Sequence, residues 1–220
     1  RMADHVYNNG DVVLTGGWKV SNRKIEGVKY NNDKSGFKSQ LYERTKSNGE
    51  VEYTYALAGT DFSSGADWGN NAKQKIGLSE QYSQAMVNAQ RLKEELGNNN
   101  LTFVGHSLGG GMAAACAYKT GGRALTFNAA KVSWFTTNTV FTGANIDAYV
   151  NILDELILAE GLLSRDGSIH LRINRASIMG HSITNFYKPG FFEKFVFEPC
   201  WQMSKSIENF FSPQNLMIFP

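Results

Sequence analysis

The sequence predicts an α/β fold, in which a mostly parallel central sheet is flanked by helices and preceded by an N-terminal antiparallel hairpin. An apolar strand, a sharp turn and a helix follow one another across residues 101–118, which is the repeating unit of a parallel sheet. Residues 79–96 have the apolar periodicity of an amphipathic helix. Asn48-Gly49 separates two alternating segments and indicates a hairpin. A chain of 220 residues can bury a core as a single domain, residues 1–220.

The elements before the parallel unit can be assigned in order along the chain. Residues 1–9 are expected to form a short helix, and residues 10–36, rich in Gly, Asn and Lys, a loop with short elements. The hairpin strands are expected at residues 36–46 and 51–58, on either side of SNGE at residues 47–50.

A helix is expected to precede the central strand, with a polar loop before it. Residues 62–77 are polar and contain glycine, so we predict a loop that borders the functional site. Ser79 is the expected N-cap and Gly97 the stop signal of the helix. Its predicted buried face consists of Met86, Ala89, Leu92 and Leu96.

The run GHSLGG at residues 105–110 contains the candidate catalytic nucleophile. It follows an apolar strand at residues 101–104 and precedes a small-residue helix at residues 112–118. A serine at the apex of such a turn, here Ser107, is the nucleophile elbow of the α/β-hydrolase fold. Gly105 and Gly109 fit this geometry, because a Cβ at either position would obstruct the close approach of strand and helix.

A serine hydroxyl needs a base, and four histidines could supply it. His5 and His106 precede the serine, whereas the base follows it in α/β-hydrolases. His170 lies in an alternating, strand-like segment, and His181 lies in a loop-like segment after a glycine. We predict His181 as the base, because catalytic groups favour loops at strand ends, with His170 as the alternative.

The acid that orients the base is expected between the serine and the histidine. The segment 146–153 resembles a buried strand, and Asp154 follows it. Active sites of α/β sheets lie at the carboxyl ends of the strands, which favours Asp154 over Asp147 at the other end. Asp154 could instead cap a following helix, and the two roles are compatible. The other acids in this interval are Glu155, Glu160 and Asp166.

Two backbone amides are expected to form the oxyanion hole. One comes from Leu108, the residue after the nucleophile. The other should come from a loop after an earlier strand, and the strand at residues 50–58 ends in Gly59-Thr60. We therefore predict Thr60 as the second donor.

Three motifs in this order resemble the class 3 (fungal-type) lipase family, and its bacterial lipase-like branch in particular. They are AGTD at residues 58–61, an Asp-Trp pair at residues 67–68, and the elbow at residues 105–110, within a resemblance that runs from about residue 37 to residue 186. Ala58 stands where the family has arginine, and no helical cap is evident.

The resemblance implies the same site residues as the residue-by-residue argument. Carried over by position, it implies Ser107, Asp154 and His181 as the triad, with Thr60 and Leu108 as oxyanion donors.

It also implies a lipase or phospholipase that cleaves lipid acyl esters through an acyl-enzyme, without a cofactor or metal. Bacterial members of the family include toxins delivered to rival cells, which implies a dedicated inhibitor (immunity) protein in the producing cell. The alternatives are a hydrolase of small esters or thioesters, an acyltransferase, and a binding module with a dead site.

Composition excludes several function classes. The chain has 22 Lys and Arg against 20 Asp and Glu, a formal net charge of +2, and this balance gives no nucleic-acid footprint. Two cysteines make no disulfide framework, and Cys116 is expected to fill a small space in the core. We find no signal-peptide pattern and no apolar run long enough to span a membrane. The family resemblance favours secretion or delivery by a secretion system.

The C-terminal segment, residues 187–220, is rich in aromatic residues and unlike the family core. We interpret it as a segment that wraps the same domain with its aromatics packed on the sheet. The alternative is an apolar surface that makes peripheral contact with a membrane or binds a protein partner.

Overall fold

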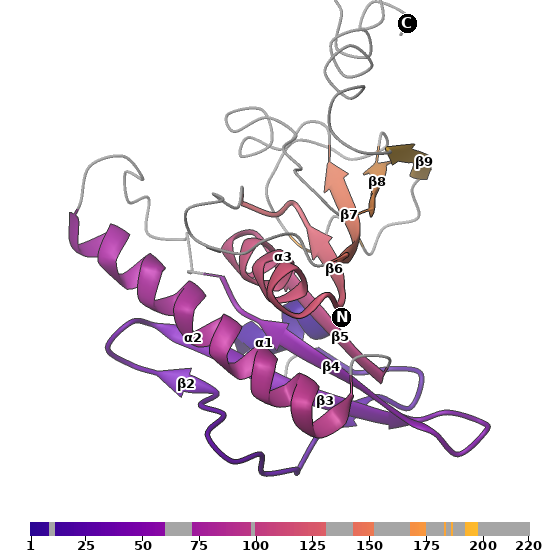
Figure 1. Ribbon diagram of the computed structural model, residues 1–220. Helices are drawn as coiled ribbons and strands as arrows, with labels where there is room; N and C mark the ends of the chain where they lie inside the picture. Colours follow the sequence, from indigo (N-terminus) through magenta and orange to yellow (C-terminus); the bar gives the residue numbers. More distant parts are fainter. Residues whose placement is uncertain are drawn as a thin grey trace, which may run out of the picture.

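The computed structural model describes residues 1–8, 12–59, 72–97, 100–130, 143–151, 168–174, 183, 186 and 192–197. Within these residues the chain forms a nine-stranded mixed sheet in the order β1-β3-β4-β5-β6-β7-β8-β9, with β2 paired to β3 beside this path. Figure 1 shows the sheet with its helices.

The N-terminal half of the sheet is antiparallel, as predicted. Strands β3 (Phe37–Thr45) and β4 (Val51–Leu57) form the hairpin around Asn48-Gly49. Gly49 has a φ of 84°, a conformation that favours glycine and explains why this dipeptide makes the turn. The short strands β1 (Lys19–Val20) and β2 (Asn31–Asn32) both pair with β3 and lie in the segment that was expected to be mostly loop.

The parallel half of the sheet begins at β4. Strands β5 (Leu101–His106), β6 (Arg123–Phe127), β7 (Asn145–Asn151) and β8 (Ser168–Asn174) follow it in parallel register. Their carboxyl ends therefore meet along one edge, which is where α/β proteins place their sites. The expected α/β fold class is confirmed: helices flank a sheet that has a parallel half and an antiparallel N-terminal hairpin.

The helix before the central strand starts earlier than predicted. Helix α2 spans Ala72–Leu96, so Ser79 lies inside the helix and is not its N-cap, and part of the loop predicted over residues 62–77 is helical. The strong helix formers from Ala72 to Lys75 outweigh the cost of Gly77, which is about 1 kcal/mol in a helix interior. The predicted end is correct, because Gly97 has a φ of 76° and its N–H donates to the Lys93 carbonyl.

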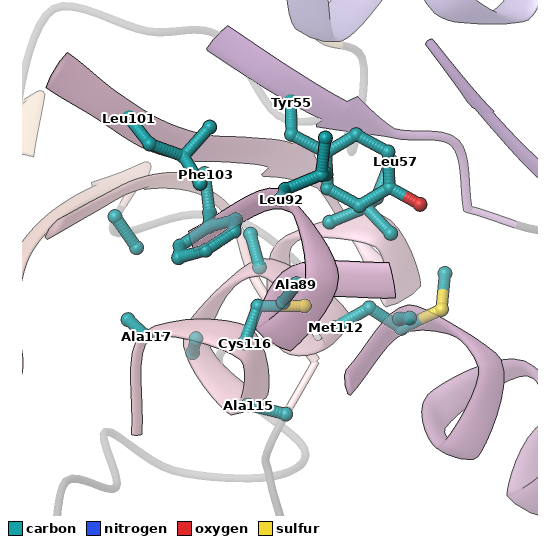
Figure 2. Close-up of a cluster of buried hydrophobic side chains, with 14 of the residues drawn as sticks. Tyr55, Leu57, Ala89, Leu92, Leu101, Phe103, Met112, Ala115, Cys116 and Ala117 are labelled. Atoms are coloured by element: carbon teal, nitrogen blue, oxygen red, sulfur yellow. The ribbon is translucent and has the colours of Figure 1, made fainter. Parts of the chain in front are cut away.

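Helices cover both faces of the sheet (Figure 1). Helices α2 and α3 (Leu108–Thr120) pack on one face, and α1 (Met2–Asn8), the short helix expected at the N-terminus, packs on the other. The alternation of β4 explains the division, because Tyr55 and Leu57 belong to the core under α2 and α3 while Ala56 belongs to the core under α1. Figure 2 shows the first core, which contains Leu57, Ala89, Leu92, Phe103, Met112 and Cys116.

The C-terminal segment contributes a further strand. Residues Phe192–Phe197 form β9, which pairs antiparallel with β8 and extends the sheet at that edge. The other parts of the segment 187–220 lie outside the described residues. Among the helices of the described part, none is long and apolar enough to cross a membrane.

Candidate active site

Ser107 lies between β5 and α3 and has a backbone conformation that residues other than glycine seldom adopt. Its φ is 56° and its ψ is −127°, which costs of the order of 1–3 kcal/mol for a residue other than glycine. Hydrogen bonds on both sides maintain this conformation. Its N–H donates to the Phe127 carbonyl at 3.0 Å, and its carbonyl accepts from the N–H groups of Gly111 at 3.1 Å and Ala130 at 2.9 Å.

The glycines around the serine are required by backbone packing. A Cβ on Gly105 would collide with the carbonyl group of Gly109, and a Cβ on Gly109 would collide with the carbonyl of Leu57 at the end of β4. A Cβ on Gly110 would lie 2.8 Å from the Cβ of Ala129. The predicted reason for Gly105 and Gly109, the close approach of strand and helix, is therefore confirmed.

The Ser107 side chain is buried, with 1% of the residue exposed. Its hydroxyl has no hydrogen-bond partner among the residues that the structure describes. Leu108 follows it as the first residue of α3. The amides of this first turn have no acceptor within the helix and lie at the positive end of its dipole, which favours a developing negative charge. The other expected donor, Thr60, lies outside the described residues.

A tyrosine from the N-terminal helix joins the ends of β4 and β5. The N–H of Gly59 donates to the hydroxyl of Tyr7 at 2.7 Å, and this hydroxyl donates to the carbonyl of His106 at 3.2 Å. Lys38 of β3 in turn donates to the Tyr7 carbonyl at 2.6 Å. No local sequence pattern marks Tyr7, so the sequence did not predict its role.

Three of the four histidines are placed by the structure, and none of the three fits the role of the base. The ring of His5 bonds the Tyr42 hydroxyl at 2.9 Å, within the contact between α1 and the sheet. His106 is the last residue of β5 and adjoins the serine directly. His181, the predicted base, lies outside the described residues.

His170, the alternative base, lies in the middle of β8. It pairs with Asp147 of β7, in the row of the sheet that contains Val104 of β5. This row lies three residues before Ser107 along the strand direction, and β8 is three strands from β5, a lateral distance of about 14 Å. A histidine and a serine side chain cannot together span this separation.

Of the two aspartates considered as the acid, the structure places Asp147 at the end of β7 away from the elbow, as expected. Asp147 lies near the amino end of the strand, where it is 5% exposed and accepts a hydrogen bond from Arg123 at 3.0 Å. It therefore stabilises the sheet away from the elbow. Strand β7 is described as far as Asn151, and residues 152–154, including Asp154, lie outside the described residues.

Comparison with known proteins gives the family. A family model described as phospholipase-like, the Tle-like phospholipase domain, matches residues 1–150 of the 220. The chain belongs to this family. An extracellular phospholipase A1 of Serratia liquefaciens is 43% identical over 105 residues, which are 47% of this chain and 30% of that protein. The chain thus spans about a third of the length of this relative.

Solved lipases are similar to this Tle-like domain at low identity. A deletion mutant of the Rhizomucor miehei lipase in complex with its propeptide is 15% identical with a TM-score of 0.47, over 72% of this chain and 56% of that one. Lipase II from Rhizopus niveus is 14% identical with a TM-score of 0.41, over 70% of this chain and 66% of that one.

A second strained residue of this Tle-like phospholipase domain lies beside the elbow. Asn128, directly after β6, is fully buried and has a φ of 40°, and its N–H donates to the Tyr149 carbonyl at 2.9 Å. Strained residues of this kind cluster at functional sites. Asn128 falls in the run LTFNAA at residues 125–130, and its place directly after a strand-like segment is a sequence signal that could have drawn attention to it.

The thiol in the elbow helix, Cys116, lies in the core. Cys116 is a free cysteine with no exposed surface, packed in the core under α2 and α3, as predicted. Burial raises the pKa of this thiol well above its ordinary value, which suppresses the reactive thiolate. Among the described residues no cluster of three or more His, Cys, Asp and Glu side chains could hold a metal ion.

Proposed function

We propose that this chain is a serine ester hydrolase that cleaves lipid acyl esters, and phospholipid esters in particular. The backbone of Ser107 carries the proposal: a buried serine with a φ of 56° stands between a parallel strand and a helix N-terminus. Membership of a phospholipase-like family supports the substrate class. So does the 43% identity to a protein named an extracellular phospholipase A1.

The proposed mechanism uses a Ser-Asp-His triad. Ser107 attacks the ester carbonyl while His181 accepts its proton, and Asp154 holds the imidazole tautomer and stabilises the imidazolium. The amides of Thr60 and Leu108 stabilise the oxyanion. The protonated His181 then delivers its proton to the leaving alcohol, and water hydrolyses the acyl-enzyme.

The described part of the chain supports this assignment by elimination. The ring of His5 bonds the Tyr42 hydroxyl, and His170 lies three strands from β5. Asp147 is engaged by Arg123 near the amino end of its strand. The Ser107 hydroxyl has no partner among the described residues. His181 and Asp154 follow the serine in the chain order that the α/β-hydrolase fold requires.

The test is product analysis by mass spectrometry after incubation with mixed bacterial phospholipids. Wild type should release fatty acids and lysophospholipids. Ser107→Ala should lower this release by several powers of ten, the scale seen when a triad member is removed. A fluorophosphonate probe should label wild type at Ser107. Activity of Ser107→Ala near that of wild type would refute the proposal.

An ester panel separates this function from its alternatives. A lipid hydrolase should prefer long acyl chains, whereas a small-ester or thioester hydrolase or an acyltransferase should prefer short ones. A binding module with a dead site should hydrolyse no ester and take up no fluorophosphonate.

We further propose that the enzyme acts on rival bacteria after secretion, as the resemblance to bacterial lipase toxins implies. Export of the chain to the periplasm of a test bacterium should then arrest growth, and Ser107→Ala should be harmless. Co-expression of a dedicated immunity protein should restore growth. Equal growth with wild type and Ser107→Ala would contradict the toxin role and leave the hydrolase chemistry untouched.

A further inference from the structure

Tyr7 is the described side chain that touches both strand ends from which the proposed oxyanion hole emerges. Its hydroxyl accepts from the N–H of Gly59, after β4, and donates to the carbonyl of His106, the last residue of β5. The phenol has one hydrogen to give, so its donor and acceptor roles are both used in this bridge. We infer that Tyr7 is a positioning residue of the oxyanion hole, an inference that rests on the proposed hydrolase function.

Each end of the bridge lies next to a proposed catalytic group. Gly59 precedes Thr60, whose amide is the proposed second oxyanion donor. His106 precedes Ser107 and, one residue further, Leu108, the other donor. The hydrogen bonds of 2.7 Å and 3.2 Å therefore tie Gly59 to His106, the residues from which the two proposed arms continue.

The same contact decides which amide of the β4 loop is available to substrate. The N–H of Gly59 is engaged by Tyr7, so it cannot also bind the oxyanion. The next amide along the chain is that of Thr60. Tyr7 therefore supports the choice of Thr60 and turns the Gly59 amide into a structural anchor.

The absence of a Cβ at Gly59 leaves room for the Tyr7 hydroxyl. A Cβ at this position would lie 2.7 Å from the Tyr7 hydroxyl oxygen, and 3.1 Å and 3.2 Å from the Gly109 nitrogen and the His106 carbonyl oxygen. Any side chain here would push the hydroxyl away from both partners. Glycine is thus needed at the end of β4 for the bridge to form.

Tyr7 belongs to helix α1, which packs on the face of the sheet opposite α2 and α3 and so holds the phenol in place. Ala3 and Val6 are buried against that face. Lys38 of β3 donates to the carbonyl of Tyr7, and the carbonyl of Lys38 itself accepts from the N–H of Ala58, one residue before Gly59. The helix and the end of β4 are therefore fixed to the same residue of β3.

A matched pair of substitutions separates positioning from stability. Tyr7→Phe removes the bridge, whereas Tyr42→Phe removes a hydroxyl that bonds His5 in the same contact between α1 and the sheet. Tyr7→Phe should lower kcat on phospholipid esters about 10-fold with KM nearly unchanged, because misplaced donors weaken transition-state stabilisation more than ground-state binding. Tyr42→Phe should keep kcat within about twofold of wild type, even if its melting temperature falls by as much as that of Tyr7→Phe.

A second readout reports on the oxyanion hole directly. The phosphonyl oxygen of a fluorophosphonate develops negative charge as it is attacked, so the labelling rate of Ser107 should fall about 10-fold in Tyr7→Phe and stay level in Tyr42→Phe. Equal kcat and labelling rates in the two variants, or a change confined to KM in Tyr7→Phe, would overturn the inference.

Gly59→Ala and Ser107→Ala complete the experiment. Where Tyr7→Phe yields no folded protein, Gly59→Ala displaces the phenol in its place, and a wild-type kcat in that variant would overturn the inference. Activity retained by Ser107→Ala would show that the proposed function has failed. A dead Ser107→Ala with equal Tyr7→Phe and Tyr42→Phe would show that only the role of Tyr7 has failed.

Discussion

Gly109 in the first turn of α3 and Leu57 at the end of β4 are packed backbone to backbone. A Cβ on Gly109 would overlap the Leu57 carbonyl oxygen, because the two atoms would lie much closer than the sum of their van der Waals radii, and it would lie 2.9 Å from the Gly59 nitrogen. The backbone of the elbow therefore packs directly against the end of β4, the strand that precedes Thr60. This packing ties the position of Ser107 to the position of the proposed oxyanion loop.

Gly109→Ala should therefore unfold or inactivate the domain. The added methyl meets backbone atoms, which cannot rotate away, so we expect a loss of about 3 kcal/mol or more in the free energy of unfolding. Urea denaturation and fluorophosphonate labelling measure the two effects. Gly49→Ala is the control, because it has open space around it and only its φ of 84° opposes a side chain, at about 1–2 kcal/mol. Labelling should be normal in Gly49→Ala, and normal labelling in Gly109→Ala would contradict the argument.

Asp147→Asn should affect mainly stability, whereas Asp154→Asn should affect activity. Asp147 pairs with Arg123, whose side chain is 55% exposed, so the loss of this ion pair should lower the free energy of unfolding by about 1 kcal/mol and leave kcat within about threefold. Asp154→Asn should lower kcat about 10⁴-fold, the scale seen when a triad acid is replaced. A large drop in kcat in Asp147→Asn, with Asp154→Asn active, would exchange the two roles.

Glu43 should make stability depend on pH in the acid range. The Ser21 hydroxyl donates to the Glu43 carboxylate and, with the Lys19 ammonium 3.2 Å away, lowers the pKa of this carboxyl in the folded state. A lowered folded-state pKa contributes stability above the unfolded-state pKa, and that contribution is lost as pH falls through the folded-state value. Between about pH 5 and about pH 3, the melting temperature should fall more steeply in wild type than in Glu43→Gln. Parallel curves would refute this contribution, and Ser21→Ala should lie between the two.

The parts of the fold that the sequence predicted correctly are those with local causes. The hairpin follows from Asn48-Gly49, whose glycine adopts a positive φ, and the elbow follows from Gly105 and Gly109, whose positions admit no Cβ. In each case the residue that determines the geometry is within a few positions of the structure it forms.

The parts that were missed depend on contacts between distant segments. Tyr7 and His106 are 99 positions apart, and nothing around either residue indicates that they meet. The start of α2 was misplaced because Gly77 and the polar residues before Ser79 resemble a loop, and intrinsic propensity alone could not decide between the two. Strand β9 exists because β8 offers it an edge, which no pattern within residues 187–220 specifies.

Cys116 should report on the opening of the elbow helix. The thiol is fully buried, and burial raises its pKa, so a native molecule should not react with iodoacetamide near pH 8. In a Cys200→Ser background, which leaves one thiol, labelling should require unfolding of the core around α3 and should become complete in urea. The native labelling rate then measures how often this core opens. Rapid labelling of the folded Cys200→Ser protein would show that the core beside Ser107 is accessible to solvent. This result would contradict the burial of the Cys116 side chain in the core under α2 and α3.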